Sequence, residues 1–284
     1  MTDESPNDGA PGDGAPDDGA PDDGAMDDRS ANDGAVPASA IFPGGIGVSH
    51  LRVYTSTAPD GLAGGTPHLH TACSEAYWVV AGRGRVQTIT AADGFGETTL
   101  TPGTVAWFSP GTIHRLVNDS GDLEILVLMA NSGLPEAGDM VVVQSPEVIA
   151  APEAARRAAE LPAGARTTDG DHDPARLRRD AAVEAFNAIR ADLETGDGHL
   201  LEDFLDHATA SVSAHTSHWR RCWAVGAGAA AAVTDAHLRA LAAGDGTHLR
   251  AAAIHHRTPS SGPRRLGCCG TLGTIITPEE VTVP

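Results

Sequence analysis

The sequence predicts a mainly β N-terminal domain followed by an all-α C-terminal domain. Short runs rich in Val, Ile, Thr and aromatic residues, separated by turn sequences, extend over residues 41–144. After Pro146 the apolar residues instead recur at the spacing of a helix. These patterns predict four parts: an N-terminal tail at residues 1–38, a barrel at 39–148, a helical domain at 149–258 and an extended tail at 259–284.

The N-terminal tail is predicted to be disordered. Residues 1–36 contain eleven Asp and Glu against the single Arg29, so about half of the formal net charge of −19 lies there. The segment repeats the phrase Asp-Gly-Ala-Pro and has almost no large apolar side chains, so it cannot bury enough surface to offset the entropy of ordering. We expect a solvated tail; an acidic docking arm is the alternative.

Seven β-type runs make up the expected barrel. They are separated by turn sequences such as Pro-Asp-Gly, Gly-Arg-Gly, Ala-Asp-Gly and Ser-Pro-Gly. Short strands at this spacing indicate an antiparallel sandwich or barrel. The expected strands are residues 51–55, 76–80, 85–90, 105–108, 113–118, 123–129 and 140–144.

The helical domain is predicted from caps and periodicity. Asp173 followed by Pro174 is a suitable helix start, and the sequence around Gly196 ends that helix. An Ala-rich segment around Trp219 and Trp223 extends to Leu241. We expect a separate packed unit that stabilises the barrel directly or through a dimer, with the buried aromatic residues Phe186, Phe204, Trp219 and Trp223.

Composition excludes several classes of function. The chain contains no lysine, which excludes Schiff-base chemistry and a phosphate-binding loop that needs lysine. Its acidic charge, without a helix of clustered Arg, predicts neither a nucleic-acid nor a membrane partner. The four cysteines form neither a disulfide framework nor a CxxC zinc motif. With no apolar stretch long enough for a signal peptide or a membrane span, we expect a cytoplasmic protein.

Four residues have the types and spacing of metal ligands. His68 and His70 are two apart on an extended segment, so both imidazoles point to one face. Glu75 follows a turn of four residues, and His114 begins a strand after a Ser-Pro-Gly turn. Three imidazoles and one carboxylate suit one divalent ion, with Fe, Mn, Ni, Co, Cu and Zn all acceptable, and leave one or two positions open. The alternative is that the histidines are polar groups of a metal-free barrel.

These stretches resemble the two signature motifs of the cupin superfamily. The sequence from Gly61 to Gly82 matches the first motif throughout. The second motif has Ser109 in place of the usual first Pro of its turn but matches at Gly103, Gly111, His114 and Asn118. The resemblance implies a small, single-domain, RmlC-like jelly-roll barrel that binds metal at the four residues above. It covers about 110 of the 284 residues and says nothing about the helical half.

Three further residues are candidates for a substrate pocket. Tyr77 has the strand parity of Glu75, so its ring either faces the cavity or packs within the barrel. Arg115 and Asn118 lie beside His114 in the sequence and could bind a substrate carboxylate or hydroxyl; a solvated surface role is the alternative. No catalytic residue is assigned.

Two other groups of residues could form a metal site or a disulfide. His207, His215 and His218 are the other histidine cluster able to hold an ion, but no carboxylate or Cys stands at a matching spacing. Cys268 and Cys269 are adjacent and could form a vicinal disulfide, but such bonds are strained and rare.

The sequence therefore favours a metal-dependent enzyme that acts on a small organic molecule. Dioxygenase, isomerase and lyase chemistry all fit such a site, since the ion can act as a Lewis acid or, if it is iron, bind O₂. The alternative is a non-catalytic binding or sensing protein, in which the helical half transmits occupancy or forms a homodimer. The substrate and the reaction are not predicted.

Overall fold

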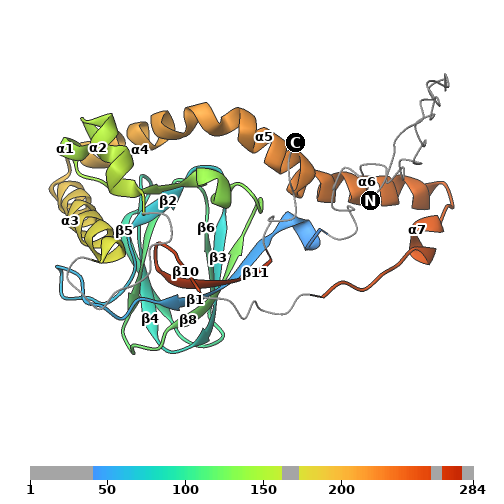
Figure 1. Cartoon of the computed structure of the whole chain (residues 1–284), viewed down its shortest axis with the longest axis horizontal. Coiled ribbons are helices and arrows are strands. Elements are labelled where there is room, and N and C mark those ends of the chain that lie inside the picture. The colour runs from blue at the N-terminus through green and yellow to red at the C-terminus, as the bar shows by residue number, and fades with distance from the viewer. Residues whose placement is uncertain (1–40, 162–172, 257–263, 277–284) are drawn as a thin grey trace, which may run out of the picture. The chain divides into compact units, whose positions relative to one another are not determined.

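The structure, a computed structural model, describes residues 41–161, 173–256 and 264–276. The predicted disordered tail at residues 1–38 lies outside the described residues. The described chain forms two antiparallel sheets followed by helices, and its last two strands return to the first sheet (Figure 1). The predicted jelly-roll barrel and helical C-terminal region are confirmed.

The first sheet has six strands in the order β10-β11-β1-β8-β3-β6. Strands β10 and β11 fall within the predicted extended tail, yet β11 pairs with β1 over most of its length. The sequence showed extended structure here but not its partner, because β1 lies at the other end of the barrel sequence. The strands are β1 (Gly47–Val53), β3 (Glu75–Ala81), β6 (Val105–Phe108), β8 (Glu124–Met129), β10 (Arg265–Leu266) and β11 (Gly270–Ile276).

The second sheet has five strands in the order β5-β4-β7-β2-β9. Strand β5 was not predicted, because its glycines and its polar residues hide the β pattern; it is an edge strand held by a hairpin with β4. The strands are β2 (His68–His70), β4 (Gly84–Thr90), β5 (Gly94–Leu100), β7 (Ile113–Asn118) and β9 (Met140–Val142).

Apolar side chains from both sheets fill the interior of the barrel. Leu51, Tyr77 and Ile125 from the first sheet pack with Val86 and Leu116 from the second, and all five are buried. Burial of each such side chain stabilises the fold by about 1.5–3 kcal/mol. This core holds the two sheets face to face, with the candidate ligands between them.

The helices begin after β9. A short helical turn, η3 (Pro135–Asp139), precedes that strand, and η2 (Pro43–Gly45) precedes β1. Helix α3 starts at the predicted cap, where the Asp173 carboxylate accepts a hydrogen bond from the Ala175 N–H at 2.8 Å. It ends at Gly196, whose φ of 88° needs glycine. The helices are α1 (Pro146–Ile149), α2 (Pro152–Ala159), α3 (Pro174–Thr195), α4 (His199–Val212), α5 (Thr216–Val225), α6 (Ala227–Ala242) and α7 (Thr247–Arg250), with η4 (Ser213–His215) between α4 and α5.

Helices α3, α4 and α5 share one hydrophobic core with the second sheet. Phe186, Phe204 and Trp219 belong to the same buried cluster as Leu69 and Ile113 of the strands. The helices therefore pack directly on the barrel, the first of the two routes expected from the sequence, but the prediction of a separate packed unit is wrong because the two regions share one core.

The prediction that Trp223 is buried is wrong. Trp219 is 5% exposed and donates from its indole N–H to the Ala137 carbonyl at 3.0 Å, whereas Trp223 is 51% exposed. The two residues share a helix face, but the barrel covers only the part of that face at Trp219. No described helix is both long and apolar enough to cross a membrane.

Candidate metal centre

Strand pairing and one short loop bring the four candidate ligands together. His68 on β2 is directly opposite His114 on β7, so the two side chains lie next to each other on one side of the second sheet. His70, two residues further along β2, points to the same side. Glu75 is the first residue of β3 and so comes from the opposite sheet. The site thus lies between the two sheets of the barrel.

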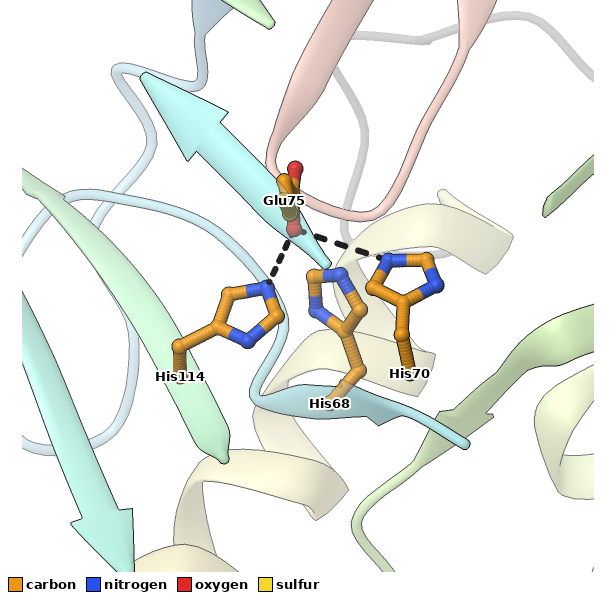
Figure 2. A group of neighbouring side chains, drawn as sticks. All are labelled: His68, His70, Glu75 and His114. Atoms are coloured by element: carbon orange, nitrogen blue, oxygen red, sulfur yellow. Dashed lines mark ion pairs between the residues drawn. The ribbon is translucent and has the colours of Figure 1, made fainter. Parts of the chain in front are cut away.

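The four side chains converge on one point, as Figure 2 shows. Their potential ligand atoms all lie within 4.8 Å of one another, and all four residues are buried. Glu75 Oε2 lies 3.0 Å from His114 Nε2 and 3.5 Å from His70 Nε2. No other group of three or more His, Cys, Asp or Glu in the described part of the chain meets in this way.

Each histidine is oriented by an oxygen atom at its Nδ1. His68 Nδ1 lies 2.8 Å from the Thr66 carbonyl, and His114 Nδ1 lies 3.1 Å from the Thr112 carbonyl. Because a carbonyl oxygen can only accept a hydrogen bond, both Nδ1 atoms carry the proton. In the neutral rings, Nε2 therefore presents its lone pair to the other ligands. This is the orientation that protein partners impose on metal-binding histidines.

Two buried atoms at the centre of the group lack a hydrogen-bond partner: Glu75 Oε2 and His114 Nε2. They lie close together, but not with the geometry of a hydrogen bond. An unpartnered buried carboxylate oxygen costs free energy, and it faces the lone pair of a neutral imidazole. A cation between them satisfies both atoms, so the donor set and its geometry fit a divalent metal ion.

The electrostatics of the group also favour a cation. Burial and the neighbouring His114 and His70 hold the pKa of His68 well below its usual range. Burial alone raises the pKa of Glu75, but His114 and His70 outweigh it, so the pKa is lowered and the carboxylate stays ionised. Burial lowers the pKa of His70, but the hydrogen bond to Asp139 and the charge of Glu75 outweigh it and raise that pKa. The group therefore offers a cation the ionised carboxylate of Glu75 and the neutral ring of His68, whereas His70 gives up its proton when it binds the ion.

Asp139, which no sequence pattern indicated, holds the site together. Its buried carboxylate lies 3.2 Å from His70 Nδ1 and accepts hydrogen bonds from the backbone N–H groups of Thr71, Ala72 and Cys73. These bonds fix the loop between His70 and Glu75. Burial opposes ionisation, but the hydrogen bonds dominate and lower the pKa of Asp139 to about 2. No spacing could indicate this residue, because only the pairing of β2 with β9 brings it to His70.

Of the three substrate-pocket candidates, the structure brings only Tyr77 to the cluster. Its buried ring lies edge-on to His114, with 6.3 Å between ring centroids. Burial and the charge of Glu75 raise the pKa of Tyr77 well above its usual range, so its hydroxyl stays protonated. Tyr77 also belongs to the barrel core, so both of its predicted roles fit this position.

Arg115 and Asn118 lie away from the four ligands. Strand alternation turns Arg115 to the other side of β7, where its buried guanidinium pairs with Asp60. Asn118 lies four residues along the strand from His114. Its Oδ1 accepts hydrogen bonds from Gly121 and Leu123 N–H, and its Nδ2 donates to the Val53 carbonyl. Both side chains are buried and hold the barrel together. They therefore lie neither at the metal site nor at a solvated surface, the two positions considered from the sequence.

The comparisons with known proteins concern the barrel. Residues 54–129 match the family model described as the cupin domain. No curated protein matches the chain. The barrel is therefore a cupin domain, as the two motifs predicted.

Several solved structures also match over part of the chain. Oxalate decarboxylase from Bacillus subtilis is 16% identical with a TM-score of 0.26, over 30% of this chain and 20% of that one. Capsular polysaccharide assembling protein CapF from Staphylococcus aureus is 20% identical with a TM-score of 0.22, over 30% of this chain and 22% of that one. A protein with a double-stranded beta-helix domain from Klebsiella pneumoniae is 17% identical with a TM-score of 0.25, over 34% and 71%. This chain thus spans about a fifth of the first two structures.

Proposed function

We propose that this cupin domain binds one divalent ion of the first transition row through His68, His70, Glu75 and His114. We further propose that the protein is an enzyme that acts with this ion on a small organic molecule. The observation that carries the proposal is the unpartnered pair of buried atoms, Glu75 Oε2 and His114 Nε2, at the centre of three oriented imidazoles. A bound ion supplies Lewis-acid polarisation or, if it is iron, a place for O₂, which suits dioxygenase, isomerase or lyase chemistry.

The chain's own residues give this site a defined shape and bury it. The Phe108 ring packs on His114 with 4.3 Å between centroids, and the Tyr77 ring closes the same side. Asp139 holds His70, and the Thr66 carbonyl holds His68. Glu75 is the one negative charge among the four ligands. A molecule that enters the site therefore meets fixed nitrogen donors, one carboxylate and aromatic walls.

The experiment that tests the proposal is metal analysis of untagged protein, followed by binding of a small anion. We expect one equivalent of metal per chain in the wild type, and weaker binding in Glu75→Gln, which keeps the size but removes the charge. Azide added to the cobalt-loaded protein should change its visible spectrum if a coordination position is open. Screening candidate substrates for O₂ uptake then tests for dioxygenase activity. Protein without stoichiometric metal affinity contradicts the proposal.

One observation favours sensing as a second candidate function. Leu69 lies between two ligands and Ile113 precedes a third, and both side chains pack in the cluster that contains Phe186 and Phe204 of the helices. A shift of the ligand strands on metal binding therefore reaches α3 and α4 directly. Hydrogen exchange measured with and without metal tests this: a change of protection in α3 and α4 supports sensing, and a change confined to β2, β3 and β7 contradicts it.

We also propose that a homodimer forms through α6. No residue of this helix is buried although half of them are Ala, and Leu238 and Leu241 are exposed. Asp235 and Arg239 pair with each other along this helix, so neither leaves an unpaired charge beside the exposed leucines. Analytical ultracentrifugation should show a dimer for the wild type and a monomer for Leu238→Glu. A monomeric wild type contradicts this part of the proposal.

A further inference from the structure

The turn between β10 and β11 lies beside the candidate metal centre. Gly267 N–H donates to the Gly270 carbonyl at 2.8 Å, so Cys268 and Cys269 are the two central residues of a tight turn. The pale red hairpin in Figure 2 turns next to Glu75. Both thiols are free; burial raises the pKa of each thiol, and the charge of the nearby Glu75 carboxylate raises it further. Two soft ligand atoms thus stand close to a site that the four-residue group leaves partly open.

Hydrogen bonds fix this turn relative to the ligands. Thr66 N–H donates to the Cys268 carbonyl at 2.9 Å, and the Thr66 carbonyl is the group that holds His68 Nδ1. Tyr54 N–H donates to the Cys269 carbonyl at 3.1 Å, and the Tyr54 hydroxyl donates to the Gly267 carbonyl at 3.1 Å. The backbone of the turn therefore has a fixed position relative to His68.

The two cysteines have different surroundings. Cys269 is buried in the barrel core and packs against Gly65, where a Cβ atom would lie only 2.7 Å from Cys269 Sγ. Cys268 Sγ instead lies 3.3 Å from Met140 Sδ. Met140 is directly opposite His70 in the pairing of β2 with β9, so its side chain lies on the same side of the sheet as that ligand. Cys268, half-buried against the same core, therefore places its thiol on the ligand side, whereas Cys269 is buried within that core.

We infer that Cys268 is a fifth protein ligand of the metal ion, an inference that rests on the proposed metal site. Cys268 Sγ lies outside the group of four, so coordination requires the side chain to change rotamer from Met140 toward the ion. The thiol S–H bond breaks, its proton passes to solvent, and the sulfur–metal bond forms; no electron is transferred. In a six-coordinate ion this ligand leaves one position for a small molecule.

A thiolate ligand also narrows the choice of metal. Thiolate favours Zn, Co, Fe and Cu, whereas sites for Mn are built from harder oxygen ligands. The structure thus assigns this cupin domain a preference for a thiophilic ion over Mn, which three histidines and a carboxylate alone do not specify.

Cobalt substitution in the full-length protein tests the inference. A cysteine thiolate bound to Co(II) gives an intense sulfur-to-metal charge-transfer absorption in the near ultraviolet. We expect this band in the wild type and in the matched control Cys269→Ser, and its loss in Cys268→Ser with the cobalt content unchanged. We also expect Cys268→Ser to lower the ratio of zinc to manganese affinity by at least about tenfold.

The possible results distinguish failure of the Cys268 assignment from failure of the metal site. Wild-type protein that binds cobalt without the band, or a band that persists in Cys268→Ser, overturns the ligand assignment and leaves the four-residue site intact. Wild-type protein that binds no cobalt overturns the proposed metal site itself. If Cys268→Ser does not fold, retention of the band in each of Cys73→Ser, Cys222→Ser and Cys269→Ser assigns it to Cys268, and its loss in any one of them overturns the assignment.

Discussion

The barrel and the helices contain three candidate histidine ligands each, but only those of the barrel meet. His68 and His70 are adjacent on one side of a strand, and pairing with β7 adds His114. His207, His215 and His218 lie on α4, η4 and α5 and form no such group within the described residues. A pleated strand places residues two apart on one side and a partner strand beside them, so a few positions suffice to surround an ion.

The same contrast holds for apolar residues. In the barrel, interior side chains are buried by the opposite sheet. In a helix, the burial of a side chain depends on which other part of the protein packs against that turn. Trp219 and Trp223 share one face of α5, yet only Trp219 is buried. Periodicity thus identifies the face of a helix that can be buried but not how far along the helix the cover extends.

The largest effect we expect on stability comes from this pair. Trp219→Ala removes a buried ring and its hydrogen bond to Ala137, and should lower the free energy of unfolding by on the order of 3 kcal/mol or more. Trp223→Ala should change it by less than about 1 kcal/mol, because half of the ring is already exposed. Urea denaturation of the two variants measures both values. Equal losses of stability would show that a partner outside this chain buries Trp223.

A smaller effect should follow from Asp139→Asn, which tests what holds the barrel site together. The substitution removes the charge at His70 Nδ1 and should weaken metal binding by about 10–100-fold in a competition titration. The control Asp206→Asn changes an exposed carboxylate on α4 and should have no effect. Unchanged affinity in Asp139→Asn would mean that the loop, not this carboxylate, orients His70.

Asp139 also predicts a pH dependence of the metal-free protein. Its pKa falls from an ordinary value of 3.8 to about 2 in the folded chain. The lowered pKa stabilises the fold above pH 3.8 by about 2 kcal/mol, and this contribution is lost as the pH falls from about 4 toward 2. Asp139→Asn should therefore lack this part of the acid sensitivity. Parallel curves for the variant and the wild type in urea titrations from pH 6 to pH 3 would contradict the assignment.

The smallest effect concerns the acidic N-terminal segment. Removing residues 1–36 should leave the melting temperature and the metal content unchanged, because an acidic Gly- and Pro-rich segment makes few native contacts. A melting temperature several degrees lower after truncation would show that the tail packs on the barrel or the helices.

Much of the barrel and its ligands could be predicted from the sequence because the information is local. The ligands His68, His70 and Glu75 lie within eight residues, and the turn sequences mark the strand ends. Residues that act through distant pairing could not be predicted. Asp139 reaches His70 only because β9 pairs with β2, and the turn that carries Cys268 lies beside the site only because β11 pairs with β1. Local patterns do not contain these long-range pairings.

Metal occupancy of the His68→Ala/His114→Ala double variant tests the central claim most directly. The matched control is His215→Ala/His218→Ala, which removes the same number of imidazoles from the helical segment. After both proteins are loaded with zinc and dialysed, elemental analysis should find no bound metal in the first and one equivalent per chain in the second. Full occupancy of the His68→Ala/His114→Ala variant would contradict the barrel site, and loss of metal in the control would move the site to the helices.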